Sequence, residues 1–247
     1  MDIEPEQAVQ EEIEAGAKAL ADAGPEKVLR WAFERYGDDV TLACSFGGPS
    51  GMVLLDIAAR LRPTVSVFYL DTDYLFPETY TLVEKAKRHY GIEPVAYRAR
   101  WSVDDQAKEF GEALWTSDPD MCCAIRKVEP NRRALEGKSA WIAGLRRDQS
   151  KGREEIKPVE WDSKFGLVKI NPLATWTEEQ TWTYIEEHAV PYNELHDRNY
   201  PSIGCTNCTR AVLPGEDPRA GRWSGTDKVE CGLHLPGQPE LIGEAGR

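Results

Sequence analysis

The sequence is typical of an α/β protein with a parallel sheet and helices on both of its faces. First, short runs rich in Val, Ile, Leu and Phe alternate with longer segments of helical periodicity. Second, these runs are apolar almost throughout, as expected of strands that are buried on both sides. Third, glycine-rich or charged residues come directly after the runs, at the edge where parallel sheets bind ligands.

The expected elements follow one another along the first 190 residues. Two helices come first: an Ala/Glu-rich one that ends near Ala23, and one after the Gly24-Pro25 break that ends at Gly37. Strands are then expected at residues 40–46, 64–71, 94–99, 139–145 and 167–173. Further helices are expected at residues 52–61, 78–91 and 177–188.

A glycine-rich turn, SFGGPS at residues 45–50, joins the first strand to the following helix. Backbone N–H groups in such a turn, together with the helix N-terminus, suit a phosphate group. The turn lacks the Gly-Lys-Ser/Thr ending of a Walker P-loop, so a role on the γ-phosphate of ATP is not indicated. By themselves, these residues fit a tight structural turn equally well. Charged motifs also follow the second strand (LDTD) and the fourth (RRDQS).

The charge pattern is consistent with a small anionic ligand. The net charge is −12, which disfavours general nucleic-acid binding. Basic residues nevertheless gather in CCAIRKVEPNRR, GLRRDQSKGR and PGEDPRAGRW, and such local positive sites suit a small anion. An ordinary mixture of surface charge is the alternative. No apolar run approaches the roughly 20 residues that span a bilayer, and the acidic first residues do not resemble a signal peptide. We therefore expect a cytoplasmic protein that binds neither nucleic acid nor membrane.

Three parts of the chain differ in composition. Residues 1–24 are expected to form an acidic helical extension, and residues 25–190 an α/β domain. Residues 191–247 are rich in Gly, Pro and Cys, have little periodicity and are expected to belong to the same domain. An irregular segment of this length in a compact domain is usually either functional or disordered. Its closely spaced reactive and charged groups favour a functional segment.

Six cysteines occur, at positions 44, 122, 123, 205, 208 and 231, and the absence of a secretory signal disfavours disulfides. The tandem pair Cys122-Cys123 and the C-x-x-C pair of Cys205 and Cys208 can offer four thiolates to zinc or to an iron–sulfur cluster. Adjacent cysteines are awkward for one zinc ion because their side chains normally diverge, whereas a cubane tolerates them more readily. A thioredoxin-type redox pair normally begins a helix after a strand, unlike GCTNCTRAV. Four free buried cysteines are the remaining alternative.

Cys231 stands apart, in the sequence KVECGLH. His234 and the upstream arginines are expected to help present its thiolate, the nucleophilic form, to an electrophile. A lone cysteine near a chain end is, by itself, more often incidental. Cys44, inside the first expected strand, is most simply a core residue.

Seven motifs give the sequence a family resemblance. In order, they are SFGGPS, LDTDYLFPET, CCAIRKVEP, GLRRDQS, GCTNCT, PRAGRW and ECGLH. Together they resemble the assimilatory APS/PAPS reductases, where APS is adenylyl sulfate and PAPS is its 3′-phosphorylated form. The resemblance covers roughly residues 25–235.

The resemblance implies a fold, a cofactor and a set of site residues. The fold is an adenine nucleotide α-hydrolase-like sheet related to the ATP pyrophosphatases, and the glycine-rich turn is a modified pyrophosphate loop. Members with both cysteine pairs carry a [4Fe–4S] cluster and prefer APS, which implies the ligands Cys122, Cys123, Cys205 and Cys208. Adenosine is expected at Ser45, Gly47, Leu70 and Gly144. The phosphosulfate is expected at Lys127, Arg219, Arg222 and His234.

Two departures from the family pattern occur. Arg153 is the nearest match to a further substrate arginine, but SKGREE departs from the usual threonine-arginine context there. The loop sequence GGPSG also replaces the acidic variants that are common in the family. The second change is expected to alter the chemistry of the loop and to leave its backbone donors in place.

The same resemblance implies an enzyme of sulfate assimilation and cysteine biosynthesis that reduces APS to sulfite and AMP. Cys231 is expected to attack the sulfur of APS, forming S-sulfocysteine that thioredoxin or a similar dithiol donor resolves. The donor is expected to be a separate protein, because only 16 residues follow Cys231. A homo-oligomer is also implied.

Three alternatives stay open. PAPS reduction would use the same fold and the same nucleophile. An ATP pyrophosphatase-type enzyme, such as a tRNA-thiolating protein with a cysteine-bound cluster, would need an SGGxDS loop, which this chain lacks, and would leave ECGLH unexplained. The third alternative is a zinc-binding interaction module without catalysis.

Overall fold

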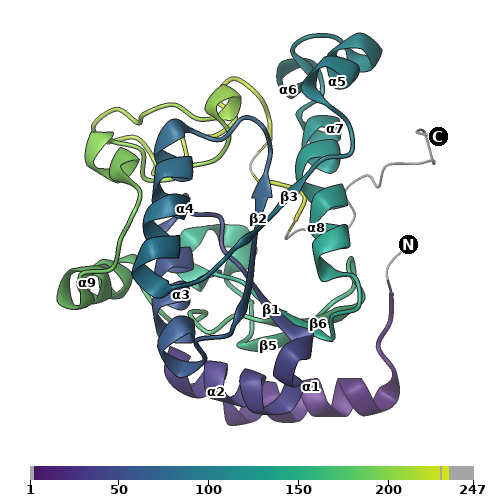
Figure 1. The fold of residues 1–247 in the computed structure, drawn as a ribbon, viewed down its shortest axis with the longest axis vertical. Helices are drawn as coiled ribbons and strands as arrows, with labels where there is room; N and C mark the ends of the chain where they lie inside the picture. Colours follow the sequence, from purple (N-terminus) through teal and green to yellow (C-terminus); the bar gives the residue numbers. More distant parts are fainter. Residues whose placement is uncertain (1–2, 229, 234–247) are drawn as a thin grey trace. The chain divides into compact units, whose positions relative to one another are not determined.

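The computed structural model describes residues 3–228 and 230–233, and its centre is a six-stranded sheet with the order β3-β2-β1-β4-β6-β5 (Figure 1). The strands are β1 (Val40–Ala43), β2 (Ser66–Asp71), β3 (Val95–Arg98), β4 (Ala140–Ile142), β5 (Val159–Asp162) and β6 (Leu167–Ile170). β1 pairs in parallel with β2 and β4, and β4 pairs in parallel with β6. The predicted α/β fold is confirmed, and all five expected strands are present.

One strand lies outside the sequence prediction. β5 pairs with β6 in the antiparallel direction, with Val159 opposite Ile170 and Asp162 opposite Leu167. Its sequence, VEWD, is only four residues long and half charged, so it lacks the apolar run that marks the other strands. It is an edge strand of a sheet whose pairs β1–β2, β1–β4 and β4–β6 are parallel, and an antiparallel edge strand is common in α/β proteins.

The helices in the connections agree with expectation, except in one region. The helices α1 (Gln7–Ala19), α2 (Pro25–Tyr36), α3 (Pro49–Leu61), α4 (Pro77–Tyr90) and α9 (Glu178–His188) were all expected. Between β3 and β4, however, the chain forms five short helical pieces that the sequence pattern did not indicate. They are α5 (Val103–Phe110), α6 (Leu114–Ser117), α7 (Pro119–Cys123), the π-helical turn η2 (Ala124–Val128) and α8 (Glu129–Leu135).

The chain divides into two compact units that interleave along the sequence. Unit 1 comprises residues 1–69, 79–95 and 135–193, and unit 2 comprises residues 70–78, 96–134 and 194–247. The glycine-rich turn lies in unit 1, whereas every cysteine except Cys44 lies in unit 2. The boundaries predicted near residues 24 and 190 stay a prediction.

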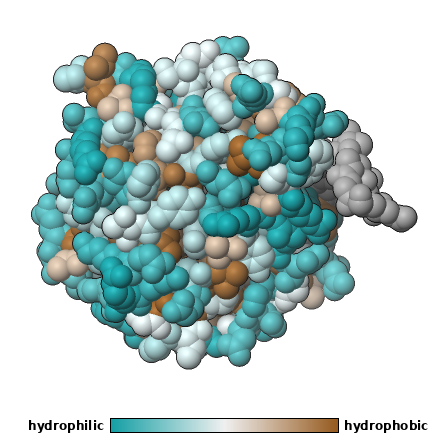
Figure 2. All heavy atoms as spheres, turned by 45° about the horizontal axis from the view of Figure 1, so that its top comes forward, coloured by the Kyte–Doolittle hydropathy of each residue, from teal (hydrophilic) through white to brown (hydrophobic). Residues whose placement is uncertain are grey.

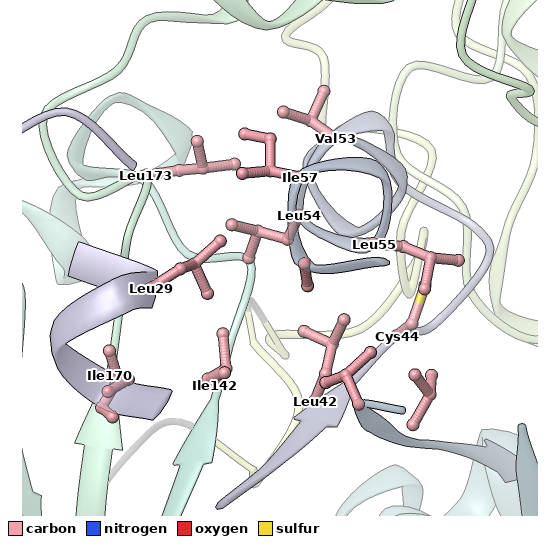
Figure 3. Packing of buried hydrophobic residues seen from close by; sticks show 14 of the residues in the cluster. Leu29, Leu42, Cys44, Val53, Leu54, Leu55, Ile57, Ile142, Ile170 and Leu173 are labelled. Atoms are coloured by element: carbon pink, nitrogen blue, oxygen red, sulfur yellow. The ribbon is translucent and has the colours of Figure 1, made fainter. Parts of the chain in front are cut away.

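The core of unit 1 forms around α3, which is buried on nearly every side (Figure 3). Leu54 and Ile57 of this helix lie among side chains from α2 and from the strands, including Leu29 and Ile142 (Figure 3). Cys44, directly after β1, is 1% exposed and belongs to this core, as expected. Burial raises the pKa of its thiol to about 12. Cys44 is therefore an inert core residue.

The N-terminal segment covers the exposed side of β5. Ile3 N donates to the Ser163 carbonyl oxygen at 2.8 Å, and Trp161 Nε1 donates to the Ile3 carbonyl oxygen at 2.6 Å. The following helix, α1, packs on β5. Because an uncovered edge strand can pair with another chain, this arrangement protects the sheet edge of unit 1.

The surface shows no extended apolar area on the face that Figure 2 presents, where hydrophobic residues lie in small groups among hydrophilic ones. Among the described residues, no helix is both long enough and apolar enough to cross a membrane.

Candidate active site

The glycine-rich turn of unit 1 leads from β1 directly into α3. Phe46 has a left-handed backbone, with φ of +53°, and its buried ring packs edge-on against Tyr69 with the ring centres 5.6 Å apart. The Asn193 amide donates to the Phe46 carbonyl oxygen at 3.1 Å, and Gly47 N donates to Ser45 Oγ at 3.4 Å. These contacts fix the turn just before the first turn of α3. The backbone N–H groups at that helix start are the kind of donors that bind an anion.

The chain after β4 approaches the start of α3 very closely. A Cβ atom on Gly144 would lie 3.2 Å from Gly51 N and 3.3 Å from the Ser50 carbonyl carbon, which leaves little room for any side chain. Arg146 donates through Nη1 to Ser50 Oγ at 2.6 Å and through Nε to Asp148 Oδ1 at 2.8 Å. Gly144 therefore lies beside the glycine-rich turn. Arg146, which was not among the predicted site residues, binds the same first turn.

Arg153 belongs to the loop that follows Gly144. It is half-buried, and its guanidinium donates to Gln149 Oε1. The same oxygen accepts a hydrogen bond from Arg146 N at 3.1 Å, and Gln149 Nε2 donates to the Gly144 carbonyl oxygen at 3.4 Å. Unit 1 thus brings together Ser45, Gly47, Gly144 and the loop that carries Arg153. The fourth predicted adenosine residue, Leu70, lies in β2 and belongs to unit 2.

In unit 2 the tandem cysteines lie where an α-helix changes into a π-helical turn. Asp118 starts α7 by accepting a hydrogen bond from Met121 N at 2.9 Å, with Pro119 at the first helical position. Cys122 and Cys123 end this helix, and η2 follows at once. A π-helical turn inside a helix is uncommon and frequently marks a functional site.

The C-x-x-C pair is fixed by segments on both of its sides. Cys205 forms an isolated β-bridge with Leu75, and its Sγ lies 3.3 Å from Thr72 Oγ1. Cys208 N donates to the Cys205 carbonyl oxygen at 3.0 Å, and the Cys208 carbonyl oxygen accepts from Trp223 N at 2.9 Å. The residues after β2 and the residues around Trp223 therefore hold the pair in place.

Unit 2 brings the two cysteine pairs together in what we call the four-thiol site: Cys122, Cys123, Cys205 and Cys208. The Cys122 thiol interacts electrostatically with the other three. Burial raises the pKa of Cys122 to about 12 and the pKa of Cys208 to about 11, and the neighbouring thiols add to both shifts. Buried thiols so close together favour the thiolate form only when a positive centre compensates their charge.

No group of three or more His, Cys, Asp or Glu side chains within residues 3–228 and 230–233 is arranged to hold a metal ion. One zinc ion draws its thiolates to about 2.3 Å from the metal. A cubane spreads its four thiolates over a larger volume. The donor set of the four-thiol site, which is made of sulfur alone, suits an iron–sulfur cluster.

Two predicted cations lie beside the thiols. Lys127 is half-buried, and although burial opposes its charge, the thiolates of Cys205, Cys123 and Cys231 raise the pKa of its ammonium group. Arg222 stacks on Trp223, with its guanidinium carbon 4.3 Å from the ring centre. Burial lowers the pKa of Arg222, while the nearby Cys231 thiolate favours its charged form. Positive charge therefore surrounds the thiol of Cys231.

Arg222 is held in one orientation. Its Nη1 donates to Ser202 Oγ at 3.2 Å, and a Cβ atom on Gly204 would lie only 2.4 Å from Nη2. Nε is buried, with no hydrogen-bond partner in the described part of the chain. Burying a charged donor without an acceptor costs free energy, unless a ligand accepts its hydrogen bond. Arg222 is consequently suited to binding an anion.

Cys231 and Arg219 are joined through Glu230. The Arg219 guanidinium donates to Glu230 Oε1 at 3.2 Å, and the Cys231 backbone N–H donates to the same oxygen at 3.0 Å. The Cys231 side chain is half-buried. Unit 2 thus brings together Cys231, Lys127, Arg219 and Arg222, whose roles stay predictions. His234, the remaining predicted residue, lies outside the described residues.

The comparisons with known proteins identify the family of the chain. The family model described as "Phosphoadenosine phosphosulfate reductase domain" matches residues 39–211. The chain belongs to this reductase family. Among its relatives, the adenosine 5′-phosphosulfate reductase of Shouchella clausii is 49% identical over 85% of this chain and 87% of that protein. That of Halalkalibacterium halodurans is 46% identical over 93% and 99%. Bacillus subtilis adenosine 5′-phosphosulfate reductase 2 is 48% identical over 84% and 88%.

Solved structures support the fold of this family member. The phosphoadenylyl-sulfate reductase of Candida auris, a phosphate complex, has a TM-score of 0.72 and 34% identity over 85% of this chain and all of that chain. The Candida glabrata FMN adenylyltransferase bound to FAD and pyrophosphate has a TM-score of 0.55 at 16% identity, covering 78% and 64% of the two chains. The second likeness shows the fold alone, and it agrees with the predicted adenine nucleotide α-hydrolase-like sheet.

Sequence reasoning missed several residues that shape the site of this reductase-family chain. Arg126 is 1% exposed, and it donates to Asp73 Oδ2 at 2.8 Å, to Gln106 Oε1 at 2.7 Å and to the Ser102 carbonyl oxygen at 3.0 Å. It therefore joins α5, η2 and the turn after β2 inside unit 2. Its place in the basic motif CCAIRK gave no sign of this internal role. Lys228 and Glu230 were also missed. The partner of Lys228, Asp120, is 108 residues away in sequence.

Proposed function

We propose that this protein reduces APS to sulfite and AMP, with Cys231 as its nucleophile. The observation that carries the proposal is the grouping of Cys231 with Lys127 and Arg222 beside the four-thiol site. The names of relatives at 46–49% identity support APS as the substrate.

The substrate-binding residues expected from the sequence are proposed for each unit by itself. The backbone N–H groups of the glycine-rich turn, with Ser45, Gly47 and Gly144, would bind the adenosine end, assisted by Leu70 and Arg153. Lys127, Arg219 and Arg222, with His234, would bind the phosphosulfate. Hydrogen bonds between ionised partners are roughly twice as strong as neutral ones, so these cations offset the repulsion between a thiolate and an anionic substrate.

The chemistry is proposed to take two steps. The Cys231 thiolate attacks the sulfur of APS, an S–S bond forms, the S–O bond to the phosphate breaks and AMP leaves with the electron pair. A thiolate of the dithiol donor then attacks Sγ of Cys231, and sulfite leaves with the electrons of the broken S–S bond. The second thiol of the donor resolves the mixed disulfide and restores Cys231. The sulfur gains two electrons and the dithiol loses two, so the electrons balance.

A protein partner and a cofactor are also proposed, although the names of the relatives mention neither. Thioredoxin is proposed as the dithiol donor. A [4Fe–4S] cluster is proposed on Cys122, Cys123, Cys205 and Cys208, where, when bound, it would cross-link the two cysteine pairs and act electrostatically beside Lys127. A homo-oligomer and a cytoplasmic location stay predictions.

PAPS reduction is the competing function, and the likeness to the Candida auris enzyme keeps it under consideration. Steady-state kinetics of the purified holoenzyme on APS and on PAPS, with thioredoxin as donor, test the proposal. We expect kcat/KM to be much larger for APS. Equal or larger values for PAPS would reassign the substrate and leave the fold and the nucleophile unchanged.

A further inference from the structure

Two ion pairs of opposite polarity flank the nucleophile in unit 2. Before Cys231, Lys228 Nζ pairs with Asp120, in the helix that carries the tandem cysteines. Next to Cys231, Glu230 pairs with Arg219 at 3.2 Å. The segment that carries Cys231 is therefore tied at two points, to two different parts of the chain.

Lys228 and Glu230 both have buried charged groups. The Lys228 side chain is 4% exposed and its ammonium group lies 5.7 Å from the centre of the Trp223 ring, while the Glu230 side chain is 9% exposed. A buried charge that loses its partner is strongly destabilising. The two pairs therefore hold Lys228 and Glu230 in place far more firmly than exposed ion pairs would.

The position of Glu230 is informative because its charge is unfavourable for the proposed reaction. A carboxylate beside a thiolate opposes both formation of the thiolate and approach of an anionic substrate. One carboxylate oxygen of Glu230, however, accepts hydrogen bonds from two donors, the Arg219 guanidinium and the Cys231 backbone N–H. Arg219 offsets the negative charge, and the hydrogen bond to N–H fixes the backbone at the nucleophile. These contacts explain why a carboxylate occupies this position. Glu230 fixes the backbone at Cys231 and does not react at the sulfur.

We propose that Lys228 and Glu230 are positioning residues, which hold the Cys231 backbone in place for attack through the pairs Lys228–Asp120 and Glu230–Arg219. This inference rests on the proposed function of Cys231. Attack on the substrate needs a fixed thiolate, whereas the later attack by the dithiol needs only access to the sulfonated sulfur. The two ion pairs consequently matter for the first step and not for the second.

The test measures the two half-reactions separately on the holoenzyme. APS is mixed with excess enzyme without a reductant, and the rate of Cys231 sulfonation is followed by rapid quenching and intact mass. The sulfonated enzyme is then isolated, and the release of sulfite by dithiothreitol is timed. The variants are Asp120→Asn, which removes the partner of Lys228, and Glu230→Gln, which keeps an oxygen acceptor for the Cys231 N–H. Lys108→Met serves as the matched control, because Lys108 forms an exposed ion pair with Asp105 in the same unit.

We expect Asp120→Asn and Glu230→Gln to slow sulfonation by roughly 10- to 100-fold, the effect of a misplaced reacting group, with the rate of sulfite release unchanged or higher. Exchange of both charges, Asp120→Lys with Lys228→Asp, should recover part of the loss. Lys108→Met should match the wild type in both steps. Variants that sulfonate at the wild-type rate, or that slow both steps equally, would overturn the positioning role. Absence of sulfonation in the wild type would instead overturn the proposed function.

Discussion

The guanidinium carbon of Arg222 lies 4.3 Å from the centre of the Trp223 indole ring. The backbone of Gly204 also lies against this guanidinium, so closely that a Cβ atom there would come within 2.7 Å of the same carbon. The arginine is thus confined before any ligand binds. Preorganised donors of this kind stabilise developing charge without the cost of reorganisation.

Gly204→Ala should displace Arg222 and weaken its contact with the substrate anion. We expect kcat/KM on APS to fall roughly 10- to 100-fold, because a small misplacement of a charged donor is costly in a closed site. Steady-state kinetics measure the effect, and the iron content of each preparation shows whether the proposed cluster on the neighbouring Cys205 is retained.

Gly24→Ala is the matched control for this change, since a Cβ atom at Gly24 meets nothing within 4 Å. It should leave the kinetics unchanged. If Gly204→Ala retained full kcat/KM with normal iron, the confinement of Arg222 would have no role in turnover.

Arg126→Met should destabilise unit 2 strongly. The substitution leaves three acceptors, on Gln106, Asp73 and Ser102, without their charged donor. Gln106 is buried, and a buried acceptor left without its partner costs about 1–3 kcal/mol. Urea unfolding followed by circular dichroism measures the free energy of unfolding. Arg100→Met removes an exposed pair with Glu129 and should cost less than about 1 kcal/mol. Similar losses for the two variants would contradict the internal role of Arg126.

Cys44 should resist alkylation under conditions that modify Cys231. With the pKa of its buried thiol raised to about 12, only about one molecule in 10⁴ carries the Cys44 thiolate at pH 8. The thiolate fraction, and with it the reactivity, rises as the pH approaches the raised pKa. Peptide mapping after brief iodoacetamide treatment measures the extent of alkylation at Cys44 and at Cys231. Labelling of Cys44 as fast as Cys231 in the folded protein would refute its assignment to the core.

Anaerobically purified protein should contain iron and acid-labile sulfide in equal amounts, and Cys208→Ser should lose most of both. The four thiols lie together in unit 2, so loss of one ligand leaves the others unable to hold a cubane firmly. Metal analysis and visible absorption measure this. A colourless protein with stoichiometric zinc would replace the cluster with a zinc site.

The sheet was readable from the sequence because its parallel strands are apolar and short, as at Leu42 and Ile142 in the core of unit 1. β5 was not readable, because Glu160 and Asp162 occupy two of its four positions. The helices between β3 and β4 were missed for a related reason: each is too short to show a periodic apolar face.

For the site, the family resemblance supplied the candidate ligand and substrate residues, whose roles stay predictions. The motifs were not sufficient to predict contacts that depend on the folded chain. Lys228 and Asp120 are 108 residues apart in sequence, and no local pattern links them. Arg126 belongs to a basic motif that suits a small anion. In the folded chain, however, its guanidinium binds Asp73 inside unit 2.

Intact mass of the Cys231→Ser variant after incubation with APS, beside the wild type, tests the proposed chemistry at its decisive atom. The wild type should gain the mass of one SO₃ group in the absence of reductant and lose it, as sulfite, when thioredoxin is added. Cys231→Ser should gain nothing and form no sulfite, with its iron content unchanged. Sulfite formation by the variant, or a sulfonated wild type whose label lies on another cysteine, would contradict Cys231 as the nucleophile.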